Sequence, residues 1–229
     1  MSSRLPPDIE LPAGNLSHRR IGSIVTVEVQ GVEYRARIVD LHHERATLHL
    51  FQELSRPSEA NLAITLIQAL PKKEKMELII QKSTELGVTA ILPCTSAKSI
   101  SLSEKIKDQD KTHRWSAIAA KAVEQSRRRL VPRIEECTDL TAALNGASGV
   151  ELKLMLYEKE LALDLHALAD RDIASVAIAA GPEGGFTEDE VALAREYGYV
   201  PVRLGGRILR CETASIAALS IVQFLWGDL

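Results

Sequence analysis

The stretch ASVAIAAGPEGGFTEDE, residues 174–190, combines a strand, a glycine-rich loop and a helix start. The apolar run at 174–180 is short, as in strands buried on both faces of a parallel sheet. Thr187 and Glu190 have the spacing of a capping box, which predicts a helix running to about Tyr197. The segment therefore indicates an α/β fold.

A second glycine loop lies close to the C-terminus. YVPVRL (199–204) is predicted to be a strand, LGGRILRCETA (204–214) holds the loop, and ETASIAALSIVQFLW (212–226) predicts a largely buried helix. Both loops thus follow what we expect to be neighbouring parallel strands, at the sheet edge where open α/β sheets bind ligands. Neither loop matches a P-loop or a dinucleotide fingerprint, so we expect a pocket walled by closely approaching backbone groups.

Upstream of these loops, helical and extended patterns alternate. Predicted helices cover residues 72–87, 103–129, 138–146 and 164–170, and predicted strands cover residues 88–94, 133–137 and 151–157. Such alternation predicts a parallel sheet with helices packed on its faces.

The first part of the chain has a different period. Residues 24–29, 32–39 and 46–51 alternate or are rich in β-branched residues, which predicts a small β-barrel or sandwich. The opening stretch with Pro6, Pro7 and Pro12 is expected to be irregular, and the run at 60–70 reads as a doubly buried strand. We therefore predict two domains, 1–70 and 71–229.

The net charge of −3 argues against indiscriminate binding to polyanions. Three basic clusters, HRR (18–20), KKEK (72–75) and RRRLVPR (127–133), still favour a localised nucleic-acid footprint. The alternative for each cluster is a solvated helix end.

Other features restrict the class of protein. No apolar run is long enough to span a bilayer, and the N-terminus lacks the pattern of a signal peptide, so we expect a cytoplasmic protein. The three cysteines form no CxxC pair, and the histidines show no metal-ligand spacing. We predict no metal site.

GPEGGFTEDE (181–190) and LGGRILRCETA (204–214) together resemble the C-terminal signature of one family. KMELIIQKSTELGV (75–88) is similar to that family's first helix, and AAKAVEQSRRRLVP (119–132) to its segment with Glu-Gln and then Arg. The family is that of the SPOUT-type methyltransferases that modify N3 of a uridine in 16S ribosomal RNA, the RsmE family. The resemblance covers about residues 70–229 strongly.

The resemblance implies a C-terminal α/β domain (71–229) with a deep trefoil knot, an exception to the rule against knots. It implies a PUA-like β-barrel over residues 1–70 that helps to hold RNA, and a homodimer with its cofactor pocket near the subunit interface. S-adenosylmethionine would lie bent in the knot, held mostly by main-chain groups of three loops. The residues that the resemblance assigns to the cofactor are Leu156, Tyr157, Glu158, Gly181, Pro182, Glu183, Gly184, Gly185, Leu204, Gly205, Arg207, Ile208, Leu209, Arg210, Thr213 and Ala214.

Three departures from the family's pattern stand out. The basic N-terminal segment is shortened, with LSHRRIGSIVTVEV (16–29) as a remnant. Arg127 stands where glycine is usual, and Cys211 replaces the usual threonine.

Methylation of uracil N3 is an in-line displacement in which the N3–H is lost and negative charge spreads onto the ring carbonyls. Such a reaction needs positioning and nearby positive charge, and can use a general base. We hypothesise that Arg210 and Arg128 bind phosphate or stabilise the uracil anion; for Arg128, a solvated basic helix end is the alternative. Glu183 or Glu212 is the candidate base, although acids also favour helix N-termini, and for Glu212 we prefer this structural role. Cys211 is interpreted as a small packing residue, because no covalent nucleophile is needed.

Two other functions remain open. One is a knotted methyltransferase that acts on tRNA or 23S rRNA. The other is a PUA-like RNA-binding protein that has lost catalysis, against which the intact glycine loops argue.

Overall fold

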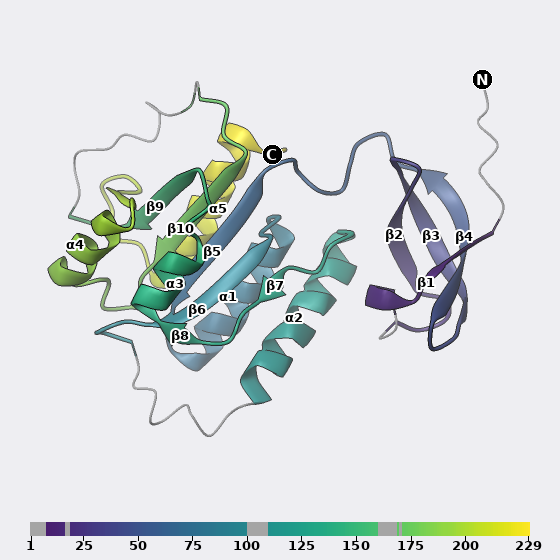
Figure 1. Ribbon diagram of the computed structural model, residues 1–229, viewed down its shortest axis with the longest axis horizontal. Coiled ribbons are helices and arrows are strands. Elements are labelled where there is room, and N and C mark those ends of the chain that lie inside the picture. Colours follow the sequence, from purple (N-terminus) through teal and green to yellow (C-terminus); the bar gives the residue numbers. More distant parts are fainter. Residues whose placement is uncertain (1–7, 17–18, 100–109, 160–168, 170) are drawn as a thin grey trace. The chain divides into compact units, whose positions relative to one another are not determined.

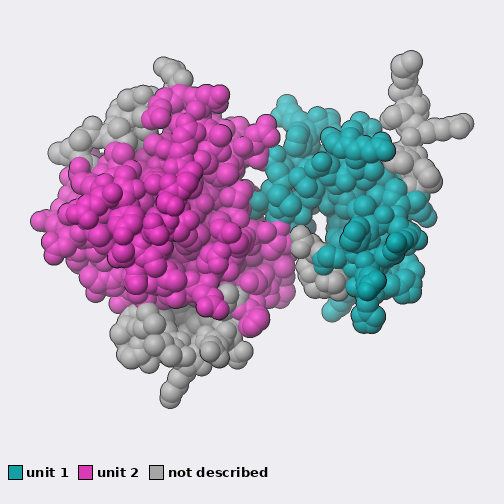
Figure 2. Space-filling model, in the orientation of Figure 1, with its two compact units in different colours: residues 1–59, 123–130 teal, residues 60–122, 131–229 magenta. Residues whose placement is uncertain are grey.

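The computed structural model describes residues 8–16, 19–99, 110–159, 169 and 171–229. The chain divides into two compact units, residues 1–59 with 123–130, and residues 60–122 with 131–229 (Figure 2). The main segment of the first unit ends at residue 59, whereas the sequence predicts the domain boundary near residue 71. The reason is that strand β5 (Ala63–Ala69) pairs with strands of the second unit.

The first unit contains a four-stranded sheet of β1 (Ile9–Pro12), β2 (Ile24–Val29), β3 (Val32–Leu41) and β4 (Arg45–Glu53), with a short 3-10 helix at Gly14–Leu16. The strands are antiparallel in the order β1-β4-β3-β2 (Figure 1). Alternate side chains of β2, β3 and β4 form one buried cluster that includes Val25, Ile38 and Leu48. The β-rich prediction for this region is confirmed.

The prediction of an irregular opening is wrong for Pro12, which is the last residue of β1 and lies opposite Arg45. Because β1 is an edge strand, a residue without an N–H can occupy it. Pro6 and Pro7 lie outside the described residues.

The second unit alternates strands and helices as predicted. Its strands are β5, β6 (Ala90–Thr95), β7 (Arg133–Ile134), β8 (Thr138–Asp139), β9 (Leu152–Leu156), β10 (Ser175–Ala180) and β11 (Val200–Val202). Its helices are α1 (Lys73–Glu85), α2 (Asp110–Ser126), α3 (Leu140–Gly146), α4 (Glu188–Glu196) and α5 (Cys211–Trp226), the last turn of α2 belonging to the first unit. The helix predicted at 164–170 falls largely outside the described residues.

All strand pairs of this sheet are parallel, in the order β11-β9-β10-β5-β6-β7, with β8 beside β6. The strands that precede the two glycine loops, β10 and β11, are therefore not direct neighbours, and this part of the prediction is wrong. Strand β9 lies between them and adds a third loop to the same edge of the sheet.

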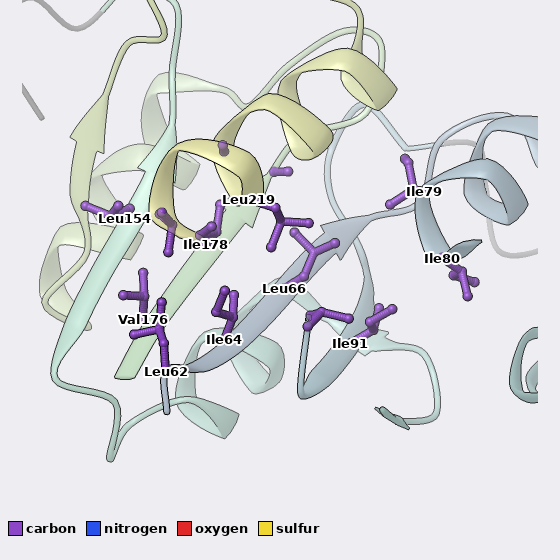
Figure 3. Packing of buried hydrophobic residues seen from close by; sticks show 14 of the residues in the cluster. Leu62, Ile64, Leu66, Ile79, Ile80, Ile91, Leu154, Val176, Ile178 and Leu219 are labelled. Carbon is purple, nitrogen blue, oxygen red and sulfur yellow. The ribbon is translucent and has the colours of Figure 1, made fainter. Parts of the chain in front are cut away.

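Each face of the sheet is covered by helices. On one face, side chains such as Ile64, Ile178 and Leu219 pack together from β5, β10 and α5, with α1 and α2 in the same cluster (Figure 3). On the other face, α3 and α4 cover side chains such as Ile67 and Ala177. Successive residues of β5 and β10 point to opposite faces, so both strands are largely apolar on both faces, with Gln68 of β5 as a buried polar exception.

Two helix ends explain local features of the sequence. Thr187 and Glu190 form the predicted capping box at the start of α4. Helix α2 ends at Ser126, not at 129 as predicted, because Arg127 has a left-handed backbone conformation with φ of 62°. A left-handed position at Arg127 is one that glycine adopts without strain.

Candidate functional site

The carboxyl ends of β9, β10 and β11 surround a pocket with about 720 Å³ of empty space, part of it open to solvent. The three strands are adjacent in the sheet, so three loops that are distant in sequence meet there. The lining residues are Leu156, Tyr157, Glu158, Gly181, Pro182, Glu183, Gly184, Gly185, Val202, Arg203, Leu204, Arg207, Ile208, Leu209, Cys211 and Ala214.

Most of the residues that the sequence assigns to a cofactor lie in this lining. Gly205, Arg210 and Thr213 do not: Gly205 is exposed, Arg210 is the N-cap residue of α5, and Thr213 is exposed on the first turn of that helix. Val202 and Arg203 line the pocket without having been assigned to it. Both lie in the strand predicted at 199–204, directly before the second glycine loop. The end of that predicted strand could therefore have identified them as lining residues.

The first glycine loop is shaped by its own backbone. Gly185 has a φ of +65°, and its N–H donates to the carbonyl of Pro182 at 3.0 Å. A Cβ on Gly181 would lie 3.1 Å from the Cα of Gly185, which is closer than ordinary contact. These two glycines are therefore required for the loop to fold back on itself, and the backbone of the loop becomes a wall of the pocket.

Lys75 joins two walls of the pocket. Its Nζ lies 3.3 Å from Glu183 Oε1 in the first glycine loop and 3.2 Å from Glu212 Oε2 at the start of α5. Glu183 Oε1 also accepts the backbone N–H of Lys72 at 3.1 Å. The first turn of α1 thus contacts both loops through charged groups.

These contacts keep the three groups ionised. Burial acts to lower the pKa of Lys75, but hydrogen bonds to Glu212 and Glu183 raise it above its ordinary value. Burial acts to raise the pKa values of Glu183 and Glu212, but hydrogen bonds from backbone N–H groups and from Lys75 leave both lowered. A carboxylate with a lowered pKa is a weak proton acceptor, so the arrangement disfavours either acid as a general base.

Cys211 is buried beside this cluster, and its thiol donates to Glu212 Oε2 at 3.2 Å. Burial, the hydrogen bond to Glu212 and the charge of Glu183 raise the pKa of Cys211 to about 12. The thiol therefore stays protonated near neutral pH, and its surroundings oppose a thiolate nucleophile.

Gln68, in the central strand β5, is a fully buried amide that the sequence reasoning missed. Its Nε2 faces the carbonyls of Ala69 at 2.9 Å, Gly181 at 3.3 Å and Ala180 at 3.4 Å, and its Oε1 accepts the hydroxyl of Ser215 at 2.7 Å. The available signal was an amide side chain near the end of the apolar run at 60–70.

Arg128 lies in the first unit and is not a solvated helix end. Its side chain is 5% exposed, and its Nη2 lies 2.7 Å from Glu59 Oε2. The other carboxylate oxygen of Glu59 accepts the backbone N–H groups of Arg129 and Leu130 at 2.8 and 2.9 Å. Arg129 in turn pairs with Glu33 at 3.0 Å and with Glu28 at 3.2 Å. The solvated alternative is therefore wrong for Arg128.

The arginines near the second glycine loop, in contrast to Arg128, are exposed and, in the part of the chain that the structure describes, unpaired. Arg203, Arg207 and Arg210 are exposed, and within the described ranges none of them forms an ion pair. Ile208 lies between them and is 88% exposed. The loop from 203 to 210 therefore presents three unneutralised cations and one apolar side chain to solvent.

Two features of the described residues limit the kind of site that they can form. No group of three or more His, Cys, Asp or Glu side chains is arranged to hold a metal ion. None of the helices found there has the length and apolar character that crossing a membrane requires.

The chain is similar to known RNA-modifying proteins. A family model described as an RNA methyltransferase domain matches residues 58–223. Ribosomal RNA small subunit methyltransferase E of Buchnera aphidicola subsp. Acyrthosiphon pisum (strain APS) is 33% identical over 193 residues, which cover 84% of this chain and 76% of that protein.

Solved structures show the same similarity. That of a ribosomal RNA small subunit methyltransferase E from Neisseria gonorrhoeae, bound to S-adenosyl methionine, is 33% identical with a TM-score of 0.75, covering 100% of this chain and 97% of that one. A Legionella pneumophila protein described as a methyltransferase, in complex with the bound cofactor SAM, is 31% identical with a TM-score of 0.74, covering 99% and 96%. The chain therefore belongs to the ribosomal RNA small subunit methyltransferase E (RsmE) family of RNA methyltransferases.

Proposed function

We propose that this protein transfers a methyl group from S-adenosylmethionine to N3 of a uridine in 16S rRNA of the small ribosomal subunit. The observation that carries the proposal is the pocket at the carboxyl ends of β9, β10 and β11, in a chain of this family. The similarity to structures bound to S-adenosyl methionine supports the choice of cofactor.

The lining of the pocket fits this cofactor. Leu156, Leu204 and Leu209 supply apolar surface for the adenine, and the turn around Gly185 presents backbone groups for the polar parts of the molecule. Glu158 is an acidic group in the same lining, which suits a cation. When bound there, S-adenosylmethionine supplies an electrophilic methyl group.

Arg210 is the residue that we assign to the uracil anion or to a phosphate of the RNA. It follows the pocket-lining Leu209, it is exposed, and it has no ion pair among the described residues. A guanidinium in that state can donate to the carbonyl oxygens on which charge develops when N3 loses its proton. Arg203 and Arg207, on the same loop, are assigned to RNA phosphates.

Arg128 and Glu183 receive structural roles in this proposal. The guanidinium of Arg128 is engaged by Glu59, so we assign it to holding residues 123–130 within the first unit. Glu183 accepts the N–H of Lys72 and pairs with Lys75, so we assign it to holding the wall of the pocket.

Cys211 has no covalent role in the proposal. Because its thiol is protonated near neutral pH, we expect the variant Cys211→Ser to retain turnover within about twofold, since serine preserves a donor to Glu212. Initial rates with ribosomal subunits check this, and a folded but inactive variant would restore covalent catalysis as a possibility.

The proposed partners are 16S rRNA in the small ribosomal subunit and a second copy of the chain, and the proposed location is the cytoplasm, where that subunit is found. The exposed Ile208 and the exposed Phe224 of α5 support a homodimer, because apolar side chains of this size are commonly covered at subunit contacts. The PUA-like role of residues 1–70 and the trefoil knot of residues 71–229 are part of the same proposal, supported by family membership.

One experiment tests the activity. Small ribosomal subunits are incubated with the purified protein and methyl-labelled S-adenosylmethionine, and the labelled nucleoside is identified after digestion of the 16S rRNA. We expect 3-methyluridine. Label found instead in added tRNA or 23S rRNA would support the other methyltransferase, and failure to bind the cofactor in calorimetry would support the non-catalytic RNA-binding protein.

A further inference from the structure

A polar side chain in the interior of the second unit, that of Gln68, connects both walls of the pocket. Gln68 is fully buried in β5, the central strand, and it does not line the pocket itself. A buried amide is costly unless its donors and acceptor are satisfied, so its partners indicate why the strand carries it.

The donor end of Gln68 faces the junction between β10 and the first glycine loop. The carbonyls of Ala180 and Gly181 lie 3.4 and 3.3 Å from Nε2, and the carbonyl of Ala69 lies at 2.9 Å. Two N–H groups are thus shared among three carbonyls. Gly181 is the residue at which the loop closes on Gly185, so the amide is bound where the loop leaves the sheet.

The acceptor end faces the helix that follows the second glycine loop. Oε1 accepts the hydroxyl of Ser215, which is buried in the second turn of α5, at 2.7 Å. The Ser215 hydroxyl also lies 3.0 Å from the carbonyl of Cys211, the first residue of α5 and a lining residue of the pocket. Only a nitrogen can donate to the carbonyls and only an oxygen can accept from the hydroxyl, so the chemistry fixes the orientation of the amide.

We propose that Gln68 is a positioning residue that sets the distance between the first glycine loop and the start of α5, and so shapes the cofactor pocket from beneath. The inference rests on the proposed function for the identity of the ligand. Its structural part, the coupling of the two walls, stands on the hydrogen bonds alone.

Lys75 links the same two walls nearer the surface, through Glu183 and Glu212. Its side chain is 26% exposed, so water can replace its contacts in part. Water has no such access to Gln68, and the loss of its amide leaves the Ala180 and Gly181 carbonyls and the Ser215 hydroxyl without that partner.

The chain offers a matched control. Gln223 is also a buried glutamine of the second unit; it lies on α5 and donates to the carbonyl of Leu86 at 2.9 Å, away from the residues that line the pocket. The variants Gln68→Met and Gln223→Met each replace a buried amide by an apolar side chain of similar length. Both are expected to lower the melting temperature, so stability alone does not distinguish them.

Calorimetric titration with S-adenosylmethionine distinguishes them. We expect Gln68→Met to raise the Kd about tenfold and Gln223→Met to leave it within about twofold, because only the first loses contacts to the pocket walls. The milder variant Ser215→Ala, which removes only the contact to α5, should raise the Kd about threefold and serves if Gln68→Met fails to fold. Wild-type affinity in folded Gln68→Met or in Ser215→Ala would overturn the proposal.

A second measurement needs no cofactor. Hydrogen exchange of the amides in residues 181–187 and 211–216 should be faster in Gln68→Met than in wild type and unchanged in Gln223→Met. Unchanged exchange in both segments of Gln68→Met would also overturn the proposal. If the wild-type protein fails to bind S-adenosylmethionine while this exchange pattern is found, the proposed function fails and the positioning role of Gln68 stands.

Discussion

The arginines of residues 127–129 and those of the loop 203–210 are equally basic in sequence but differ in their surroundings. In the first segment, Arg128 is buried against Glu59, and Arg129 pairs with Glu28 and Glu33. In the second, all three arginines are exposed and form no ion pair among the described residues. The first segment is neutralised by carboxylates from distant parts of the chain. They are Glu28 of β2, Glu33 of β3 and Glu59 at the end of the first unit's main segment.

The comparison shows that a cluster of arginines does not by itself identify a nucleic-acid surface. Arginines that are already neutralised release no counterions from RNA, whereas exposed and unpaired arginines do. The densest basic cluster of the sequence therefore stabilises the first unit, and the sparser one at the pocket is the candidate for RNA contact.

The largest effect is expected from breaking the buried pair in the first segment. The variant Arg128→Ala leaves Glu59, whose side chain is only 12% exposed, without its cation, which should cost about 3 kcal/mol in the free energy of unfolding of the first unit. Urea unfolding followed by circular dichroism measures it. Arg45→Ala, which removes an exposed pair with Glu10 in the same unit, is the control and should cost less than about 1 kcal/mol. Equal small losses would mean that the Arg128 pair is not structural.

The next effect concerns the second segment. Arg210→Ala should lower the methylation rate about 100-fold, as for removal of one donor to a developing anion, and leave the Kd for S-adenosylmethionine nearly unchanged. Single-turnover rates and calorimetry measure the two quantities. Arg171→Ala, an exposed arginine outside the pocket lining, is the control. Undiminished turnover in Arg210→Ala would refute its role.

The salt dependence of RNA binding tests directly which of the two arginine segments contacts RNA. The double variant Arg203→Gln, Arg207→Gln should lower the slope of log K against log salt for RNA binding by about 0.7–0.9 for each arginine removed. Arg129→Gln should leave the slope nearly unchanged, because Glu28 and Glu33 already neutralise that side chain. Filter binding at several salt concentrations measures both. The opposite ranking would place the RNA contact on the first segment.

The smallest effect is expected at Arg127. Its left-handed backbone costs a residue with a side chain about 1 kcal/mol or more, which glycine avoids at a smaller entropic cost in the unfolded chain. The carbonyl of Arg127, which accepts from Thr26 at 2.9 Å, is kept in Arg127→Gly. We expect that variant to be more stable by about 0.5 kcal/mol in the same urea experiment. A loss of stability would show that the Arg127 side chain contributes a contact of its own.

Much of the fold follows from local patterns in the sequence. The strand at 174–180, the capping box at Thr187 and Glu190, and the run that forms α5 each depend on side chains close to one another in the chain. The patterns placed the strand at 60–70 in the first domain, whereas β5 pairs with β6 and β10 of the second unit, because an apolar strand suits either sheet until its partners are known. They predicted the strand at 151–157 but not its place as β9 between β10 and β11, since strand order is decided by how the elements pack in the folded chain.

For the site, the two glycine loops could be found from the sequence, because backbone shape at Gly181 and Gly185 requires glycine locally, and most of the other lining residues came only from the resemblance to the RsmE family. The roles of charged and polar side chains could not. Arg128, Lys75 and Gln68 owe their states to Glu59, to Glu183 and Glu212, and to Ser215, each brought close by tertiary folding. The sequence by itself determined the α/β class and where backbone would face a ligand; only the tertiary structure decided which cations are neutralised and which remain free, because ion pairing and burial depend on residues far apart in the chain.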